Sequence, residues 1–161
     1  MSKPCRSLAV LALAALLAGC TNFSSVKSGM PEQQVQAKLG APGAVWKNPD
    51  GSAVWEYPQG PFGRETFMVT MGPDHAMREI HQVLSDEYFS MVRAGMSRDE
   101  VRRILGAPGE TTVFDARGEE VWSWRYQEHV AMMFYALFDR SAGTVRTTMR
   151  IEEVLFRDPD C

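Results

Sequence analysis

The sequence is poor in the residues that build metal and redox sites. It has only three cysteines and three histidines in 161 residues. The cysteines stand at positions 5, 20 and 161, so no two of them have the spacing of a zinc-ligand pair or a C-x-x-C motif. His75, His81 and His129 also lack a ligand spacing such as H-x-x-x-H, and each is typical of a turn or a strand face. We therefore expect no metal and no cofactor.

The sequence also lacks a strong charge of one sign and a hydrophobic run long enough to remain in a membrane. Its formal net charge is −3. A mildly acidic chain is a poor ligand for nucleic acid and has no strong electrostatic hold on anionic lipid. The apolar run from Leu8 to Ala18 is too short to span a bilayer as a permanent helix.

This run belongs instead to a targeting segment. Lys3 and Arg6 form a basic start, and the run ends in Leu17-Ala18-Gly19-Cys20, which resembles a bacterial lipobox. The resemblance implies that residues 1–19 are a cleaved lipoprotein signal peptide. It also implies that the Cys20 thiol carries the covalent lipid. The alternative is an ordinary secretory signal with a chance cysteine at position 20.

Two further expectations follow from this processing. Thr21 follows the cysteine, and similarity to sorted lipoproteins then implies a lipid-anchored protein on the periplasmic face of the outer membrane. Loss of Lys3 and Arg6 would take the net charge to −5. Cys161 would be the only remaining thiol in an oxidising compartment, either as an unpaired terminal cysteine or in an intermolecular disulfide.

The main feature of the sequence is a repeated phrase. Residues 26–43 and 92–109 share the pattern G-M-x-x-x-x-V-x-x-x-L-G-x-P at a spacing of 66 positions. The aromatic segments 54–57 and 121–124 also correspond, and we align Met77-Arg78 with Met149-Arg150 further on. Two copies predict a duplicated structural unit, with the first repeat at 20–84 and the second at 85–161.

Each copy begins with a helix pair. In the second copy Ser97 and Glu100 have the spacing of a capping box, and Gly106 supplies a terminating residue with positive φ. The first copy has Pro31 in place of Ser97, so its N-cap is weaker.

After each helix pair the hydrophobic period changes to two. The expected strands cover 45–47, 52–57, 65–71 and 77–83 in the first copy, and 111–114, 120–127, 130–138 and 144–155 in the second. We therefore predict an α+β fold of two tandem helix-helix plus antiparallel β-meander units, with the helices packed on one face of the sheet. Each copy would be marginally stable alone, so we expect the two to share a sheet edge or a core.

The repeated phrase, placed after a lipobox and before an aromatic strand, resembles the BamE/SmpA/OmlA outer-membrane lipoproteins. The resemblance covers residues 23–84 and 89–155. The doubled unit is also similar to the tandem-repeat beta-lactamase inhibitor proteins. The BamE resemblance implies an accessory role in the assembly of β-barrel outer-membrane proteins. The chain departs from BamE in carrying two units, and it lacks a polar-aromatic segment between Cys20 and Phe23.

No residue set in the sequence predicts an enzyme. Ser24 and Lys27 form an S-x-x-K pattern without the further elements of a serine acyl-enzyme. Glu119-Glu120 and Glu152-Glu153 are adjacent strand residues, which point to opposite faces and cannot act together as acid and base. Met132-Met133 is typical of core filling.

Aromatic residues supply the candidate protein-binding positions. Trp55 and Tyr57 share one strand face, and Trp122 and Trp124 share the equivalent face of the second copy. The favoured interpretation is that these rings form the core beneath the helices; the alternative is a platform for a partner. Under the core interpretation Ser123 points outward, and Ser123→Arg is expected to be harmless.

The sequence thus predicts a non-catalytic protein-interaction module in β-barrel assembly or envelope integrity. Its partner would be an envelope protein such as the β-barrel assembly machine, and nucleic acid is not expected. The alternatives are an inhibitor-like protein that binds an envelope or secreted hydrolase and a purely structural tether. Neither the oligomeric state nor the partner follows from the sequence.

Overall fold

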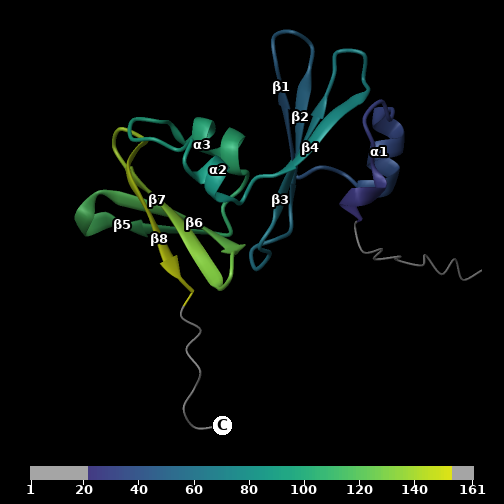
Figure 1. Cartoon of the computed structure of the whole chain (residues 1–161). Coiled ribbons are helices and arrows are strands. Elements are labelled where there is room, and N and C mark those ends of the chain that lie inside the picture. Colours follow the sequence, from purple (N-terminus) through teal and green to yellow (C-terminus); the bar gives the residue numbers. More distant parts are fainter. Residues whose placement is uncertain (1–21, 154–161) are drawn as a thin grey trace, which may run out of the picture.

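The computed structural model describes residues 22–153 as two units that follow one another along the chain (Figure 1). The first unit contains the 3-10 turn η1 (Phe23–Ser25), helix α1 (Glu32–Leu39) and strands β1 (Ala44–Lys47), β2 (Ala53–Pro58), β3 (Thr66–Met71) and β4 (Met77–Gln82). The second contains α2 (Asp86–Phe89), α3 (Arg98–Leu105), β5 (Glu110–Phe114), the 3-10 turn η2 (Asp115–Arg117), β6 (Glu119–Gln127), β7 (Ala131–Asp139) and β8 (Thr144–Glu152). The lipobox, Cys20 and Cys161 lie outside the described residues.

The predicted α+β class is confirmed. Each unit forms its own four-stranded antiparallel meander, in the orders β1-β2-β3-β4 and β5-β6-β7-β8. The strand ranges agree with the predicted ones to within a few residues. The expectation of a shared sheet edge is wrong, because within residues 22–153 no strand of one sheet pairs with a strand of the other. The opening helix of the first copy is only a 3-10 turn.

The helix caps and helix ends predicted from the sequence are also confirmed. Ser97 and Glu100 form the capping box at the start of α3, whereas Pro31 gives α1 no side-chain cap. Gly40 and Gly106 end the two helices with φ of 81° and 78°, a region that glycine enters at low cost. Both helices therefore end at a glycine with positive φ.

Two pairs of hydrogen bonds correct the alignment of the later parts of the copies. Met77 exchanges backbone hydrogen bonds with the Gly29–Met30 turn, and Val145 does so with Gly95–Met96. Met77 is therefore equivalent to Val145, and the sequence alignment of Met77 with Met149 is wrong by four residues. The error arose because both positions are followed by arginine, while the backbone pairing ignores that side chain.

Each unit has a separate core between its helices and one face of its sheet. The first core contains Val26, Val35, Leu39, Trp55, Tyr57, Val69, Met71 and Met77. The second contains Leu84, Phe89, Val92, Val101, Leu105, Trp124, Tyr126, Phe134, Ala136, Phe138 and Val145. The prediction that the helices pack on one face of each sheet is confirmed.

The layers follow one another across the molecule. Helix α1 covers one face of the first sheet, and α2 and α3 lie between the first and second sheets (Figure 1). Side chains of α3 contact the other face of the first sheet. The first sheet is thus covered on both faces. Among residues 22–153, no helix lies over the face of the second sheet that points away from α2 and α3.

Candidate interaction surface

The four aromatic residues proposed from the sequence lie in or against the cores. Trp55, Tyr57 and Trp124 are 8%, 5% and 1% exposed, and Trp122 is partly buried against the second core. This supports the favoured core interpretation. A ring that the protein itself already covers is not free to contact a partner, so the interaction surface has to be sought elsewhere.

The same aromatic position closes the helix end in both copies. The Tyr57 hydroxyl donates to the Gly40 carbonyl at 3.1 Å, and Trp124 Nε1 donates to the Gly106 carbonyl at 3.3 Å. Burial raises the pKa of Tyr57 to about 12, so its hydroxyl stays protonated and keeps this donor at ordinary pH. These bonds satisfy carbonyls that a helix leaves free at its C-terminal end.

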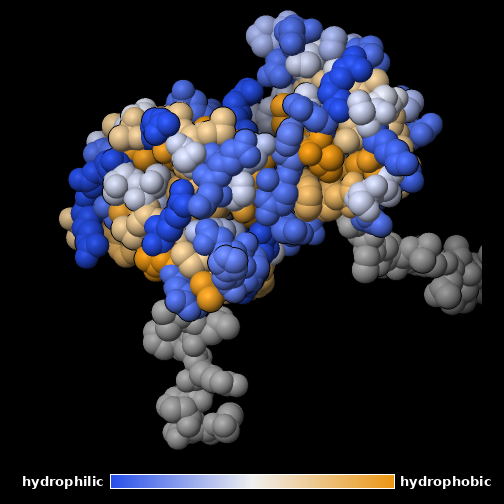
Figure 2. All heavy atoms as spheres, viewed as in Figure 1, coloured by the Kyte–Doolittle hydropathy of each residue, from blue (hydrophilic) through white to orange (hydrophobic). Residues whose placement is uncertain are grey.

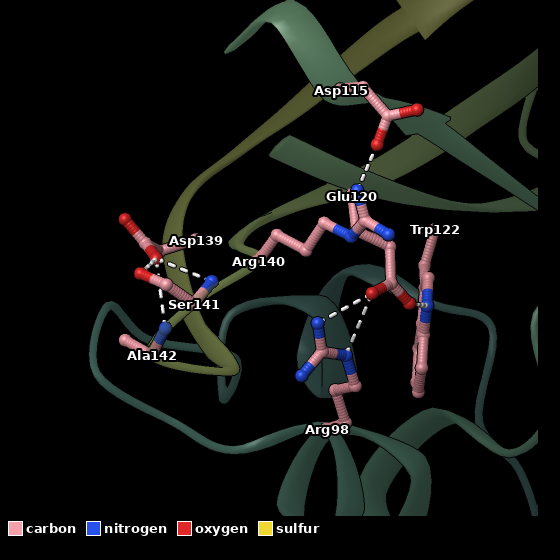
Figure 3. A network of polar contacts seen from close by, with 8 residues as sticks. All are labelled: Arg98, Asp115, Glu120, Trp122, Asp139, Arg140, Ser141 and Ala142. Atoms are coloured by element: carbon pink, nitrogen blue, oxygen red, sulfur yellow. Dashed lines mark hydrogen bonds and ion pairs between the residues drawn. The ribbon is translucent and has the colours of Figure 1, made fainter. Parts of the chain in front are cut away.

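A polar network fixes the partly exposed ring of Trp122 (Figure 3). The Arg98 guanidinium donates through Nε to Glu120 Oε2 at 3.0 Å, and Trp122 Nε1 donates to Glu120 Oε1 at 2.6 Å. The hydrogen bond from Arg98 holds the pKa of the Glu120 carboxyl below its usual range. Glu120 thus joins the first turn of α3 to strand β6 and orients the indole.

The two units meet around the buried carboxylate of Glu56, on the face of β2 opposite Trp55 and Tyr57. Glu56 is fully buried and accepts hydrogen bonds from Trp46 Nε1 at 3.2 Å and from the Ala107 N–H at 2.8 Å. Arg102 Nε of α3 lies 3.5 Å from Glu56 Oε2. A buried charge needs such partners, since an unpaired one is costly to remove from water. Glu56 therefore fixes the end of α3 on the first sheet.

A groove of about 270 Å³ runs beside this junction. Apolar side chains of both units, among them Val54, Met68, Val83 and Ile104, line it. Arg103 lines it too and lies over the Trp46 ring at 5.0 Å from the centroid, a cation–π distance. The groove is an internal feature of the two-unit body, between the outer face of the first sheet and α2–α3.

The β2–β3 loop of the first unit contacts the second unit in return. We call residues 59–64 the clasp. Arg64 of the clasp donates to Gln127 and pairs with Glu153 at 2.9 Å. Arg125 donates to the Pro61 carbonyl at 3.1 Å, and its guanidinium lies 5.3 Å from the Phe62 ring centroid. Each unit therefore covers part of the other, which stabilises their relative placement.

This contact overturns one expectation about Ser123. Ser123 does point away from the second core, as strand alternation predicts, yet it is only 6% exposed. Its carbonyl accepts from the Gly109 N–H, and the Pro61 carbonyl lies close to Gly109. An arginine at position 123 would have to displace this packing, so the structure predicts that Ser123→Arg is destabilising, against the expectation from strand alternation.

The rest of that sheet face is open to solvent. We define the open face as six neighbouring outward residues of β5–β8: Phe114, Val121, Tyr135, Leu137, Met149 and Ile151. Val121 lies opposite Leu137, and Tyr135 lies opposite Met149, in the paired strands. Phe114, Met149 and Ile151 are 42%, 44% and 48% exposed, and Phe62 of the clasp is 80% exposed at its margin. Exposed apolar side chains that adjoin one another in this way mark interaction sites.

Charged residues frame the open face. Arg146 and Glu119 pair at one end, and Arg125, Glu153 and Arg64 form a network at the other. Figure 2 shows one side of the molecule, where hydrophobic patches on both units are separated by charged residues. An apolar centre with a charged rim is the usual anatomy of a protein–protein interface.

Three of the groups considered for catalysis and metal binding have structural partners. The Ser24 hydroxyl donates to Asn22 Oδ1 at 2.6 Å. His75 Nδ1 lies 3.0 Å from Glu32, and His81 Nε2 lies 3.1 Å from Glu79. Within residues 22–153 no three histidine, cysteine or acidic side chains come together as a metal site. In the same part of the chain, no helix has the length and apolar character needed to cross a bilayer.

The carboxylate pairs separate as strand alternation predicts. Glu119 pairs with Arg146, while its neighbour Glu120 binds Arg98 on the opposite face. Met132 packs against the second core, but Met133 is buried on the outer face at 7% exposure. The prediction of core filling therefore holds for Met132 alone.

Comparison with known proteins finds a distant similarity of structure. No protein-family model matches the sequence, and no curated protein matches it. Among solved structures, the fold is similar to one from Streptococcus mutans described as a "putative beta-lactamase inhibitor protein". The identity is 11%, the match covers 80% of this chain and 92% of that chain, and the TM-score is 0.31.

Proposed function

We propose that this chain is a lipid-anchored protein of the outer membrane, facing the periplasm, that binds another envelope protein without turnover. The observation that carries the proposal is the open face. It presents adjoining apolar side chains to water on a sheet whose other face is fully packed. Exposure of this apolar surface to water is unfavourable, and its burial against a partner would lower the free energy of the complex.

The class of partner rests on the sequence motifs. The lipobox ending in Cys20 and the repeated G-M-x-x-x-x-V-x-x-x-L-G-x-P phrase are similar to those of BamE/SmpA/OmlA lipoproteins. We propose membership of that group in tandem duplicate, with a partner from the β-barrel assembly machine or another envelope-integrity complex. The open face would bind it by shape and apolar contact, and the charged rim would set its orientation.

An inhibitor of an envelope or secreted hydrolase is the second candidate function. The projecting ring of Phe62 favours it, because the clasp holds this ring at the margin of the open face with most of its surface in water. A single aromatic side chain on a fixed loop suits insertion into a cleft, and its entropic cost of binding is low. The identity of the bound protein separates the two functions.

The membrane anchor gives the first prediction. Cys20→Ala should move the protein out of the outer-membrane fraction, as a soluble or uncleaved precursor, and abolish labelling with palmitate. The thiol is the only atom of the lipobox that can accept the lipid, and several acyl chains are needed for stable anchoring. Cys161→Ser is the matched control and should stay in the membrane. Continued labelling of the Cys20→Ala protein would show that the lipobox interpretation is wrong.

The open face gives the second prediction. In affinity purification from detergent-solubilised membranes, Phe62→Ala should lower recovery of the partner about tenfold or more, the effect typical of an aromatic side chain that inserts into its partner. Met91→Ala is the control, because Met91 is also exposed, at 49%, but lies beside the inter-unit groove. Equal losses in both variants would place the partner elsewhere. Recovery of barrel-assembly subunits would support the first function, and recovery of a hydrolase the second.

A further inference from the structure

The repeat allows the two units to be compared at the first turn of their long helices, α1 and α3. An equivalent backbone bridge lies at the start of each helix: Pro31 with Ala76, and Ser97 with Thr144. The residue after the first partner of each bridge is Glu32 in one unit and Arg98 in the other. The residue before the second partner is His75 in one unit and Gly143 in the other. The two units therefore place different side chains at the same point of the fold.

In the second unit an internal ion pair fills this point. The Arg98 guanidinium donates to Glu120 through Nε at 3.0 Å and lies 5.5 Å from the centroid of the Phe138 ring. Glu120 also accepts from Trp122 (Figure 3). The guanidinium passes close to Gly143, where a Cβ would lie 2.6 Å from Arg98 Nη1. The space between α3 and the β5–β6 hairpin is thus occupied by the protein's own arginine.

The first unit has smaller side chains on the sheet at the same point. Ala53 lies opposite Met71 in the first sheet, as Glu120 lies opposite Phe138 in the second. The first unit therefore has alanine in place of the glutamate and methionine in place of the phenylalanine. A pocket of about 410 Å³ lies here, and its lining includes Glu32, Val45, Ala53, Trp55, Met71 and His75.

The pocket presents a carboxylate at the position from which the second unit extends its arginine. The Glu32 side chain is 33% exposed, and its Oε2 lies 3.0 Å from His75 Nδ1. Within residues 22–153 its Oε1 accepts no hydrogen bond, so it can accept one from a ligand. Lys47 also lines the pocket, but it is solvent-exposed, and an exposed lysine keeps its ammonium in water. The half-buried charge of the pocket is therefore negative and suits a cation.

The backbone of His75 is a second, independent sign of a ligand site. Its φ is 59°, and within residues 22–153 every other residue with positive φ is a glycine. Side chains are disfavoured in this region, and such local strain is concentrated at ligand-binding and other functional positions. The unusual conformation places the imidazole beside Glu32, at the wall of the pocket.

We infer that this pocket binds a guanidinium group, supplied by an arginine side chain of a partner protein. The group would lie in the space that the Arg98 guanidinium occupies in the second unit and would donate to Glu32. Its planar face would pack on the apolar wall that Val45 and Trp55 form, which a guanidinium does better than an ammonium. The pocket belongs to the first unit and the open face to the second, so the inference does not depend on the proposed function.

Titration with N-acetyl-arginine amide tests the pocket in the full-length, processed chain in detergent. The backbone amide signals of Glu32, Ala53 and His75 should shift in a saturable manner in two-dimensional NMR. Glu32→Gln should weaken binding about tenfold or more, because it removes a hydrogen bond between charged groups. Glu79→Gln is the matched control and should bind normally. Glu79 also pairs with a histidine, His81 at 3.1 Å, but it does not line the pocket.

Transfer of the second unit's residues tests the same assignment by filling the pocket. Glu32→Arg combined with Ala53→Glu and His75→Gly reproduces the Arg98–Glu120 pair together with the glycine that it requires. The triple variant should fold, as judged by circular dichroism, and should lose the binding of N-acetyl-arginine amide. If the triple variant does not fold, the comparison of Glu32→Gln with Glu79→Gln decides the inference.

The inference is overturned if N-acetyl-arginine amide shifts no signal at the pocket, or if the folded triple variant still binds it. Equal losses in Glu32→Gln and Glu79→Gln would show attraction to the general charge of the protein and not to this site. Equal or tighter binding of N-acetyl-lysine amide or N-acetyl-glutamate amide would contradict a guanidinium ligand. Free arginine that binds more tightly than the blocked amide would contradict a protein side chain as its source.

Discussion

Trp124→Ala should lower the free energy of unfolding by about 3–5 kcal/mol, the range for truncating a large aromatic residue in a close-packed core. Trp124 is 1% exposed and its ring lies against Phe134, with centroids 5.9 Å apart. The variant also lacks the Nε1 donor, so the Gly106 carbonyl at the end of α3 loses its hydrogen bond. Chemical denaturation followed by circular dichroism measures the loss.

Trp124→Phe is the matched control for this result. It keeps most of the ring volume and removes the hydrogen bond, so its cost should be smaller, about 1–2 kcal/mol. A Trp124→Ala protein that unfolds at the wild-type denaturant concentration, yet fails to recover its partner, would contradict the core assignment and favour the aromatic platform.

Gly40→Ala should destabilise the protein by roughly 1–3 kcal/mol through backbone strain, and Gly106→Ala by about 1–3 kcal/mol more through overpacking. The two glycines end equivalent helices with nearly the same positive φ, so backbone strain is the same at both. They differ in surroundings. A Cβ at Gly106 would lie 2.7 Å from Thr66 Cγ2 of the first unit, whereas nothing lies within 4 Å of a Cβ at Gly40. The difference between the variants therefore measures the packing of one unit on the other.

Thr66→Ser removes the methyl group that a Cβ at position 106 would meet. Combined with Gly106→Ala, it should recover part of the loss, so that the double variant is more stable than the sum of the two single changes predicts. Thermal melting of the four proteins provides the comparison. Equal costs at Gly40 and Gly106 would contradict the inter-unit contact drawn from the structure.

The local structure of each unit was predictable because short-range rules determine it. The Ser97–Glu100 capping box and the positive φ of Gly106 follow from residue type at fixed spacing. The strand ranges follow from a hydrophobic period of two. These signals also placed Trp55 and Trp124 correctly beneath helices.

The junction between the units was not predictable from such rules. Glu56 lies between Trp55 and Tyr57 in β2. Because side chains alternate between the two faces of a strand, its carboxylate is expected to point away from the core and into water. The second unit instead buries it beneath α3. The same contact between units buries Ser123. Neither residue carries a sequence signal for this, because the contact depends on how two folded bodies meet.

The open face illustrates a different limit of sequence reasoning. Strand β7 is apolar at nearly every position, which is typical of a strand covered on both sides. The structure covers the side of Phe134 and Phe138 with helices and leaves Tyr135 and Leu137 half-exposed. The hydrophobic period of a strand does not show which of its two apolar faces stays exposed to solvent. The sequence therefore suggested the buried aromatic residues as binding candidates in place of the exposed ones.

Photocross-linking in intact cells tests the proposed interaction most directly. A photoreactive residue at Phe62 should give a covalent adduct with a discrete envelope protein in the membrane fraction, and the same residue at Met91 should not. The Cys20→Ala background should reduce the adduct, because the protein is then released from the membrane. Identical adduct patterns from the two positions, or no adduct from Phe62 in membranes that contain the wild-type amount of protein, would contradict binding through the open face.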